Sequence, residues 1–235
     1  MPGLIDSAGM IISSAENRME AIAQNVANSS TAGFKRNVSF SEMLSRADGA
    51  TDGTSTSQYY LDFSQGRLSE TGNSWDLAID GPALFMLRDG ERFLYSRGGH
   101  FSVSSEGNVS DGAGRILQQS GGGDLTVKGA FVEILDDGAL LEDGLPTAQL
   151  AIYEPGDKAA LTALGGSAFS APTESMTEAS RSQVRQGFVE SSNVVASDEM
   201  IAMMATIRQA ESGARVAQFY DQLIGQAITT FRSSR

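Results

Sequence analysis

Carboxylates are the side chains of this sequence best suited to chemistry, because cysteine is absent and His100 is the only histidine. Asp76 and Asp80 flank a short apolar run, and a carboxylate pair can serve as acid and nucleophile in glycoside hydrolysis. Nothing in the sequence places the two across a cleft, and aromatic residues that could line a sugar site are few. Hydrolysis by a nucleophile, histidine and aspartate would depend on His100, which has no evident partner and no nucleophile-elbow motif. The sequence therefore predicts no catalytic residue.

Two further clusters resemble ligand sites but lack the spacing that defines them. Residues 121–124 read Gly-Gly-Gly-Asp, yet the Lys-Ser or Lys-Thr pair of a phosphate-binding loop does not follow. Asp136, Asp137, Glu142 and Asp143 could bind calcium, but the alternating ligands of an EF-hand are missing. We interpret the first cluster as a turn and the second as solvated hairpin tips, with a weak calcium site as the alternative. No metal site and no cofactor is predicted.

Both ends of the chain carry apolar residues at alternating intervals of three and four. Such residues line one stripe of a helix, and a period of 3.5 is typical of a coiled coil. We expect long helices over about residues 4–27 and 197–230. Two interpretations stay open, since the seams could pair within one chain or pack against other subunits. The expected interface residues are Ile5, Ala8, Ile12, Ala15, Met19, Ile22 and Val26 in the first seam, and Met200, Met203, Ile207, Ala210, Ala214, Ala217, Ile224, Ile228 and Phe231 in the second.

Glycine separates short apolar runs between residues 66 and 166, where eighteen of the twenty-six glycines lie. Residues 88–91, 105–108 and 136–138 each contain Asp-Gly or Glu-Gly, which supplies the positive φ of a tight hairpin. Strands that recur at such short intervals favour an all-β sandwich or barrel-like domain. The expected fold class is α+β, in which long N- and C-terminal helices form a coiled-coil-like helical domain beside this central β-domain.

The composition changes along the chain predict five segments. Within the second segment, residues 47–58 are rich in Ser, Thr, Gly and Asp and are interpreted as a mobile loop or linker. The expected segments are an N-terminal helix (1–34), a linker or extended region (35–65), the central β-domain (66–166), a return linker (167–192) and a C-terminal helix (193–235).

The net charge of −12 is concentrated in the middle of the chain. Residues 47–180 hold seven Lys/Arg and twenty Asp/Glu, whereas the two ends are almost neutral. This balance excludes a basic nucleic-acid surface. No stretch approaches the roughly 20 apolar residues of a membrane span, so membrane insertion is not expected. The N-terminus lacks a basic leader and a continuous apolar run, so we expect no cleavable signal peptide.

Three segments carry recognisable motifs in order. Residues 25–36 (NVANSSTAGFKR) are similar to A-N-x-x-T-x-G-F/Y-K/R, and residues 75–85 and 95–101 to D-L-A-I-x-G-x-G-F-F and Y-T-R-x-G-x-F. Residues 186–194 (QGFVESSNV) are similar to Q-G-x-x-E-x-S-N-V. Together they resemble the bacterial flagellar basal-body rod and hook family, and most closely its proximal-rod subunit. The family-motif residues are Asn28, Thr31, Gly33, Phe34, Lys35, Gly187, Glu190, Ser192, Asn193 and Val194.

The resemblance implies a structural, non-enzymatic subunit of the flagellar basal-body rod. It would polymerise through its terminal helices into the periplasmic drive shaft that transmits torque. The implied partners are proximal and distal rod subunits, in a homo- and hetero-oligomeric axial assembly, and the flagellar type III export apparatus, which exports such subunits without a cleavable signal peptide. The alternatives are a distal-rod or hook-type axial subunit, a carbohydrate-binding β-domain with helical appendages, and a cytoplasmic coiled-coil adaptor.

Overall fold

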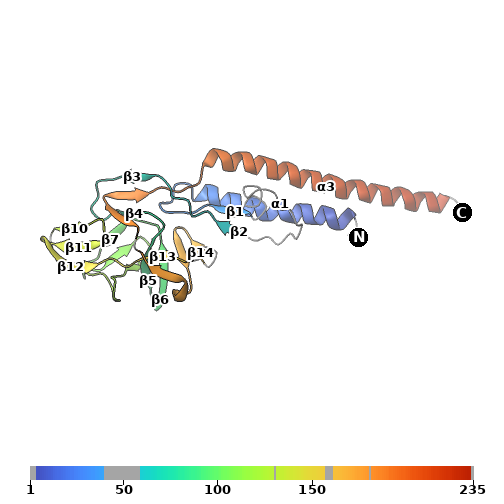
Figure 1. Ribbon diagram of the computed structural model, residues 1–235. Coiled ribbons are helices and arrows are strands. Elements are labelled where there is room, and N and C mark those ends of the chain that lie inside the picture. The colour runs from blue at the N-terminus through green and yellow to red at the C-terminus, as the bar shows by residue number, and fades with distance from the viewer. Residues whose placement is uncertain (1–3, 40–58, 130, 157–160, 180, 234–235) are drawn as a thin grey trace. The chain divides into compact units, whose positions relative to one another are not determined.

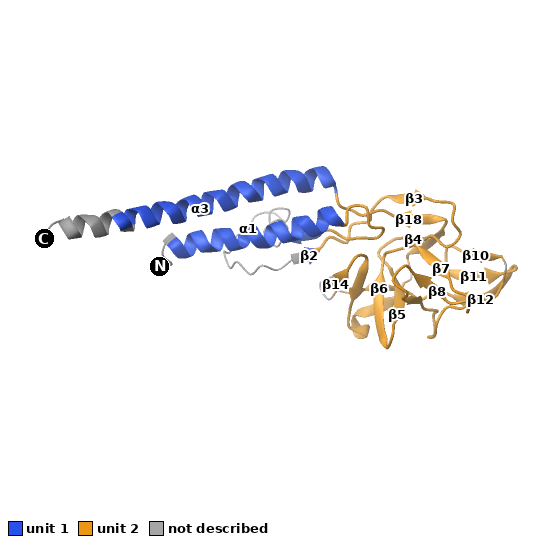
Figure 2. Cartoon of the chain, turned by 180° about the vertical axis from the view of Figure 1, so that it is seen from behind, with its two compact units in different colours: residues 1–27, 37–60, 195–235 blue, residues 28–36, 61–194 orange. Residues whose placement is uncertain are grey.

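The computed structural model describes residues 4–39, 59–129, 131–156, 161–179 and 181–233 (Figure 1). The chain divides into two compact units, coloured separately in Figure 2. Unit 1 comprises residues 1–27, 37–60 and 195–235, and unit 2 comprises residues 28–36 and 61–194. The interpretation of residues 47–58 as a mobile loop lies outside the described residues.

Unit 1 contains two long α-helices, α1 (Leu4–Ala27) and α3 (Ala196–Ser233). It also contains β1 (Asn37–Ser39), which pairs with β2 (Tyr59–Leu61), a strand whose last residue belongs to unit 2. The buried side chain of Asn25 in α1 fixes the start of β1. Its Nδ2 donates to the Asn37 carbonyl over 2.9 Å, and its Oδ1 accepts from the Asn37 amide over 2.8 Å. This amide therefore acts as a strand partner for a segment just twelve residues further along the chain.

The two helices pack along each other inside unit 1, and the buried positions of α3 carry small and polar residues. Glu199, Thr206 and Gly213, spaced by seven residues, are its buried positions among the side chains described. Gly213 lies so close to α1 that a Cβ there would be 3.0 Å from Ile11 Cγ2 and 3.1 Å from Ile12 Cγ1. Small residues thus allow the two helix backbones to approach each other.

The expected coiled-coil-like domain is therefore wrong. In a coiled coil the apolar seam residues bury one another, yet Met200 is 53% exposed and Ile207 is 44% exposed. The buried positions of α3 each lie one residue before a predicted seam position, and one residue turns a helix by about 100°. The described chain thus combines one long helix at each end with a β-rich unit, and its helices are not a coiled-coil pair.

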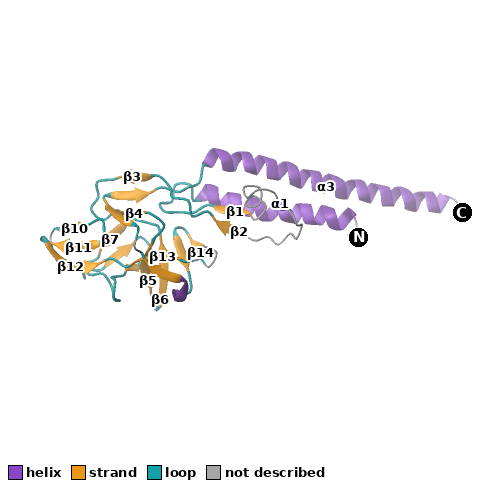
Figure 3. Cartoon of the chain, in the orientation of Figure 1, coloured by secondary structure: helices purple, strands orange, loops and turns teal. Residues whose placement is uncertain are grey.

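Unit 2 consists of short strands in several sheets, the largest of which has nine strands (Figure 3). One 3-10 helix, η2 (Thr173–Ser175), lies between two of them. The strands are β3 (Leu68–Glu70), β4 (Leu77–Asp80), β5 (Leu84–Asp89), β6 (Arg92–Ser96), β7 (Phe101–Val103), β8 (Val109–Asp111), β9 (Ile116–Leu117), β10 (Val132–Ile134), β11 (Ala139–Glu142), β12 (Leu145–Gln149), β13 (Ile152–Pro155), β14 (Thr162–Gly165), β15 (Ala168–Ser170), β16 (Met176–Glu178), β17 (Gln183–Gln186) and β18 (Phe188–Glu190).

Antiparallel pairing in unit 2 combines local hairpins with pairs of strands that lie far apart in the chain, such as β5 with β13 and β6 with β15. The three predicted hairpins are confirmed, since β5 pairs with β6, β7 with β8 and β10 with β11. Gly90, Gly107 and Gly138 have φ of 59°, 86° and 84° in their turns, as such hairpins require. At the ends, β3 pairs with β18 and β4 with β17. The last strands of the unit therefore hold its first ones in place.

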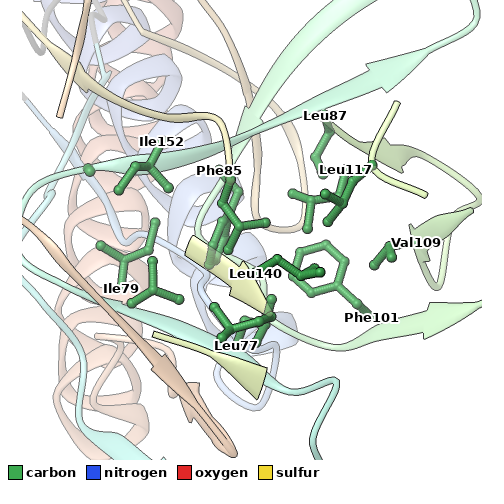
Figure 4. Packing of buried hydrophobic residues seen from close by; sticks show 14 of the residues in the cluster. Leu77, Ile79, Phe85, Leu87, Phe101, Val109, Leu117, Leu140 and Ile152 are labelled. Atoms are coloured by element: carbon green, nitrogen blue, oxygen red, sulfur yellow. The ribbon is translucent and has the colours of Figure 1, made fainter. Parts of the chain in front are cut away.

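The core of unit 2 lies among these sheets (Figure 4). Leu77 and Ile79 of β4 pack there with Phe85 and Leu87 of β5, all essentially without exposed surface. Phe85 also meets Phe101 edge to face, with ring centroids 5.5 Å apart. The β4 strand also pairs with β17, whose Val184 belongs to the same core, so the core includes the last part of unit 2. In the described residues, no helix is long and apolar enough to cross a membrane.

Gly213→Leu is expected to separate the two helices of unit 1. The new side chain would collide with Ile11 and Ile12, and overpacking of this kind costs about 1–3 kcal/mol. Thermal unfolding followed by circular dichroism at the helical band should begin at lower temperature. Ser212→Leu, at the exposed neighbouring position, is the control and should unfold like the wild type. Equal melting of both variants would contradict the small-residue contact.

Candidate functional site

Glu190, the last residue of β18, is a buried carboxylate with both oxygens engaged. Its Oε1 accepts from Lys35 Nζ over 2.6 Å and from the Gly66 amide over 2.8 Å. Its Oε2 accepts from Arg97 Nε over 2.8 Å and lies 2.5 Å from Arg97 Nη2. A buried charge is tolerated only when it is paired and hydrogen-bonded. We call Lys35, Arg97 and Glu190 the Glu190 cluster.

The two cations of the cluster are also satisfied by backbone carbonyls. Lys35 Nζ donates to the Ser64 carbonyl over 2.7 Å. Arg97 donates from Nη1 to the carbonyls of Gly81 and Ala83, and from Nη2 to that of Ile79. The exposed fractions of Lys35 and Arg97 are 1% and 4%. Arg97 thus anchors the turn between β4 and β5 to the carboxylate.

The cluster holds more positive than negative charge, and this affects Lys35. Burial lowers the pKa of its ammonium group, because a low-dielectric site disfavours the charged form. Attraction to Glu190 raises the pKa and repulsion from Arg97 lowers it again, so that the pKa of Lys35 stays below its ordinary value. Glu190 is therefore the counter-charge on which both buried cations depend. Its loss would leave Lys35 and Arg97 buried without a negative partner.

Asn193 makes a second junction three residues further on. Its Oδ1 accepts from the Arg36 amide over 2.8 Å. Its Nδ2 donates to the Asp62 carbonyl over 2.7 Å and to the Ser64 carbonyl over 3.1 Å. The Asp62 amide in turn donates to the Arg36 carbonyl over 2.9 Å. One amide side chain thus joins segments that follow β18, β2 and the turn after α1.

Two glycines allow the backbones to meet around the cluster. The Gly33 amide donates to the Glu190 carbonyl over 2.8 Å, and Gly33 has a φ of 71°. A Cβ at Gly33 would lie 2.3 Å from the Arg97 carbonyl carbon, and one at Gly66 would lie 1.9 Å from the Ser191 oxygen. Neither position has room for a side chain, and the φ of Gly33 is one that other residues rarely adopt.

The structure thus brings the three sequence motifs to one place. Lys35, Arg97 and Glu190 come from the first, second and third motif in turn. Sequence reasoning named Lys35 and Glu190 without their ion pair, and it did not select Arg97. The available signal was a charged residue directly after a hairpin strand, β6, whose last residues are buried.

The other family-motif residues shape the segments that lead into the cluster. The Thr31 amide donates a hydrogen bond to the Asn28 carbonyl, and the Phe34 amide donates one to the Thr31 carbonyl. The side chains of Phe34 and Val194 are buried, and the Val194 amide donates to Ser192 Oγ. Gly187 has a φ of 80°, and its amide donates to the Asp76 carbonyl.

The predicted interface residues of the helices fall into different environments. Buried positions are Ala8, Ala15 and Ile22; half-buried ones are Ile12, Met19, Val26, Met203, Ala210, Ala214 and Ala217; exposed ones are Ile5, Met200 and Ile207. The side chains of Ile224, Ile228 and Phe231 lie outside the described part. Only the first group is almost fully buried in the single chain, and the other two groups keep part of their surface exposed.

The carboxylate pair weighed for hydrolysis is not arranged as an active site. Asp76 is buried and accepts from Thr71 Oγ1 over 2.6 Å and from Asn73 Nδ2 over 3.0 Å, and its Oδ1 lies 2.9 Å from His100 Nδ1. Burial alone would raise the pKa of Asp76, but hydrogen bonds from Thr71, His100 and Asn73 outweigh it and leave the pKa below its ordinary value. Asp80 is exposed at the end of β4. His100 therefore has a partner that the sequence did not reveal.

In the two clusters that resembled ligand sites, Asp124, Asp137 and Glu142 make ion pairs or hydrogen bonds within the fold. Asp124, after the glycine turn, pairs with Arg88, and Glu142 Oε2 accepts from the Gly129 amide. Asp137 caps its own hairpin by accepting from the Ala139 amide. Among the residues that the structure describes, no group of three His, Cys, Asp or Glu side chains could hold a metal ion.

Glu190→Gln is expected to destabilise unit 2 by about 3–5 kcal/mol, because it leaves two buried cations without a counter-charge. Lys35→Met keeps the Arg97–Glu190 pair and should cost less, about 1–3 kcal/mol. Urea unfolding measures both free energies. Asp124→Asn is the control at the partly exposed Arg88 pair and should cost about 1 kcal/mol or less. A smaller loss for Glu190→Gln than for Lys35→Met would contradict the charge assignment.

Alkaline pH is expected to stabilise the wild type relative to Lys35→Met. The pKa of Lys35 is lower in the folded than in the unfolded chain, so between that lowered pKa and about 10.5 the unfolded chain binds more protons. The free energy of unfolding contributed by Lys35 therefore rises with pH in this window and is lost as pH falls through the lowered pKa. Urea unfolding of both proteins from pH 7 to 10 measures the difference. A difference that falls with pH would contradict the burial of a charged Lys35.

Comparison with known proteins identifies the fold's family. Residues 185–230 match the family model described as flagellar basal body rod FlgEFG protein C-terminal. The flagellar basal-body rod protein FlgF of Mesorhizobium japonicum is 30% identical over 93% of this chain and 93% of its own. FlgG of Bacillus subtilis is 26% identical over 92% and 94%. The hook protein FlgE of Rhizobium meliloti is 36% identical over 43% of this chain and 26% of its own.

These matches confirm the resemblance to rod proteins of the proximal type. The FlgF similarity covers nearly the full length of both chains, so it includes the helices and the β-rich unit together. The matched C-terminal model includes Glu190, Asn193 and most of α3. The chain belongs to the flagellar basal-body rod protein family.

Proposed function

We propose that this chain is a structural subunit of the flagellar basal-body rod that joins other axial subunits through the outward faces of its long helices. The observation that carries the proposal is the apolar surface of α3. Its exposed apolar side chains are Met200, Ile201, Met204, Ile207, Val216, Phe219 and Leu223. Exposed apolar residues that gather on one element are typical of a protein contact surface.

The helix contact inside unit 1 leaves this surface available. The buried positions of α3 among the described side chains are Glu199, Thr206 and Gly213, of which Gly213 lies against α1, whereas Met200, Met204 and Ile207 are exposed. The predicted interface residues therefore fall into two groups with different functions. Ala8, Ala15 and Ile22 hold the helices of one chain together, whereas exposed residues such as Met200 and Ile207 serve neighbouring subunits. A head-to-tail contact that does not close on itself produces a filament.

The segments of the chain take matching roles in this proposal. The N- and C-terminal helices form the assembling core of the rod, and the β-rich middle carries the acidic surface. The family-motif residues serve the fold of each subunit through the Glu190 cluster. None of these roles requires catalysis, and we propose a chain without enzymatic activity.

The relatives' names indicate the flagellar basal body. Because both rod and hook proteins are among the relatives, we infer assembly with other axial subunits. We extend this to the periplasmic part of the rod, with proximal and distal rod subunits as neighbours. Export by the flagellar type III apparatus without a cleavable signal is part of the same proposal. The absence of cysteine suits assembly in an oxidising compartment.

Met204→Asp and Phe219→Asp are expected to remove the subunit from purified basal bodies and to abolish swimming, because each places a charge in an apolar contact. Both side chains are exposed in the single chain, so its folding should persist. Immunoblots of basal bodies and circular dichroism of the purified variants measure the two effects. Leu164→Asp, at an exposed apolar position of unit 2, is the matched control. Normal incorporation of both α3 variants would refute the proposed contact.

A further inference from the structure

The chain passes between its two units four times, after residues 27, 36, 60 and 194. A force on the helices of unit 1 reaches unit 2 along the covalent chain at these passages. The hydrogen bonds made by the unit 2 residues next to these four positions therefore determine how the β-rich unit responds to load.

Asn193 holds three of the four passages. It lies next to the passage after residue 194, its Oδ1 accepts from the Arg36 amide beside the second passage, and its Nδ2 donates to the Asp62 carbonyl beside the third. The bond from the Asp62 amide to the Arg36 carbonyl closes this set. The Asn193 side chain thus joins its own segment to those of Arg36 and Asp62.

Glu190 holds the remaining passage. The segment that enters unit 2 at residue 28 is tied to it by the Gly33 amide and by Lys35 Nζ, at 2.8 and 2.6 Å. Behind Glu190, Arg97 and the pairing of β18 with β3 connect the carboxylate to the sheets. Charge-assisted hydrogen bonds in a site without water are stronger than neutral ones in water.

We propose that Glu190 and Asn193, with Lys35, Arg97 and Arg36, form a mechanical clamp that carries load from the long helices into the sheets of unit 2. Stability alone does not explain a buried ion cluster, since apolar residues of similar volume are often as stabilising. The directional hydrogen bonds of Glu190 and Asn193 to backbone atoms hold the segments beside the four passages in fixed positions under strain. The use of the clamp in torque transmission rests on the proposed rod function, but its existence does not.

Single-molecule pulling on the full chain tests the clamp, and the absence of cysteine allows defined attachment points. One pair of handles, Ala23→Cys and Ser197→Cys, lies at exposed positions of α1 and α3 and loads the passages. A second pair, Glu91→Cys and Glu106→Cys, lies at exposed hairpin tips and loads the sheets directly. The unfolding rate of unit 2 at constant force is measured in both geometries.

Glu190→Gln loses charged hydrogen bonds, and Asn193→Ala loses neutral ones to two segments. Each is expected to speed unfolding about tenfold through the helix handles. Through the hairpin handles their effect should be much smaller. Asp124→Asn is the matched control and should act mainly through the hairpin handles. Should Glu190→Gln fail to fold, Lys35→Met replaces it.

An unchanged rate through the helix handles, or an equal increase in both geometries, would overturn the clamp. The second outcome would mean that the residues only add general stability. The measurement uses isolated chains, so it is independent of rod assembly. If the rod function were wrong, basal bodies would lack the subunit while the pulling result would stand.

Discussion

The desolvated carboxylate of Glu190 is the constraint on which the rest of unit 2 depends. A carboxylate without water must find donors elsewhere, and Glu190 takes them from Lys35, Gly66 and Arg97. These residues are as far as 155 positions apart in the chain. The segment after α1, the β6 hairpin and the last strand therefore have to fold together, and glycine at positions 33 and 66 allows the required approach.

The same arrangement separates two tasks that a rod subunit has to perform. The Glu190 cluster and Asn193 fix, inside unit 2, the segment that follows α1 and the segment that precedes α3. The small and polar seam of α3 satisfies the helix contact within one chain and leaves Met204, Phe219 and similar side chains exposed. A subunit built in this way can fold alone while it keeps apolar surface for its neighbours, because different residues serve the two contacts.

Local features of this fold were predictable, and long-range pairings were not. Asp89-Gly90 specifies its hairpin because a positive φ is a property of the turn itself. The period of 3.5 indicated the helices, but it could not locate the buried stripe of α3, since Thr206 and Ile207 belong to equally periodic sets one residue apart. The Arg97–Glu190 and Asp76–His100 pairs depend on tertiary contacts that no spacing encodes. The motifs marked where the cluster lies but not what its charges do.

Amide hydrogen exchange of the intact chain tests most directly whether the Glu190 cluster is part of the core of unit 2. The informative amides are those of Gly33 and Gly66, which donate to Glu190, compared with Leu87 in the core strand β5. If the account is correct, all three exchange through the same global opening, with equal free energies. Exchange of Gly33 and Gly66 by a much easier local opening, while Leu87 stays protected, would contradict it.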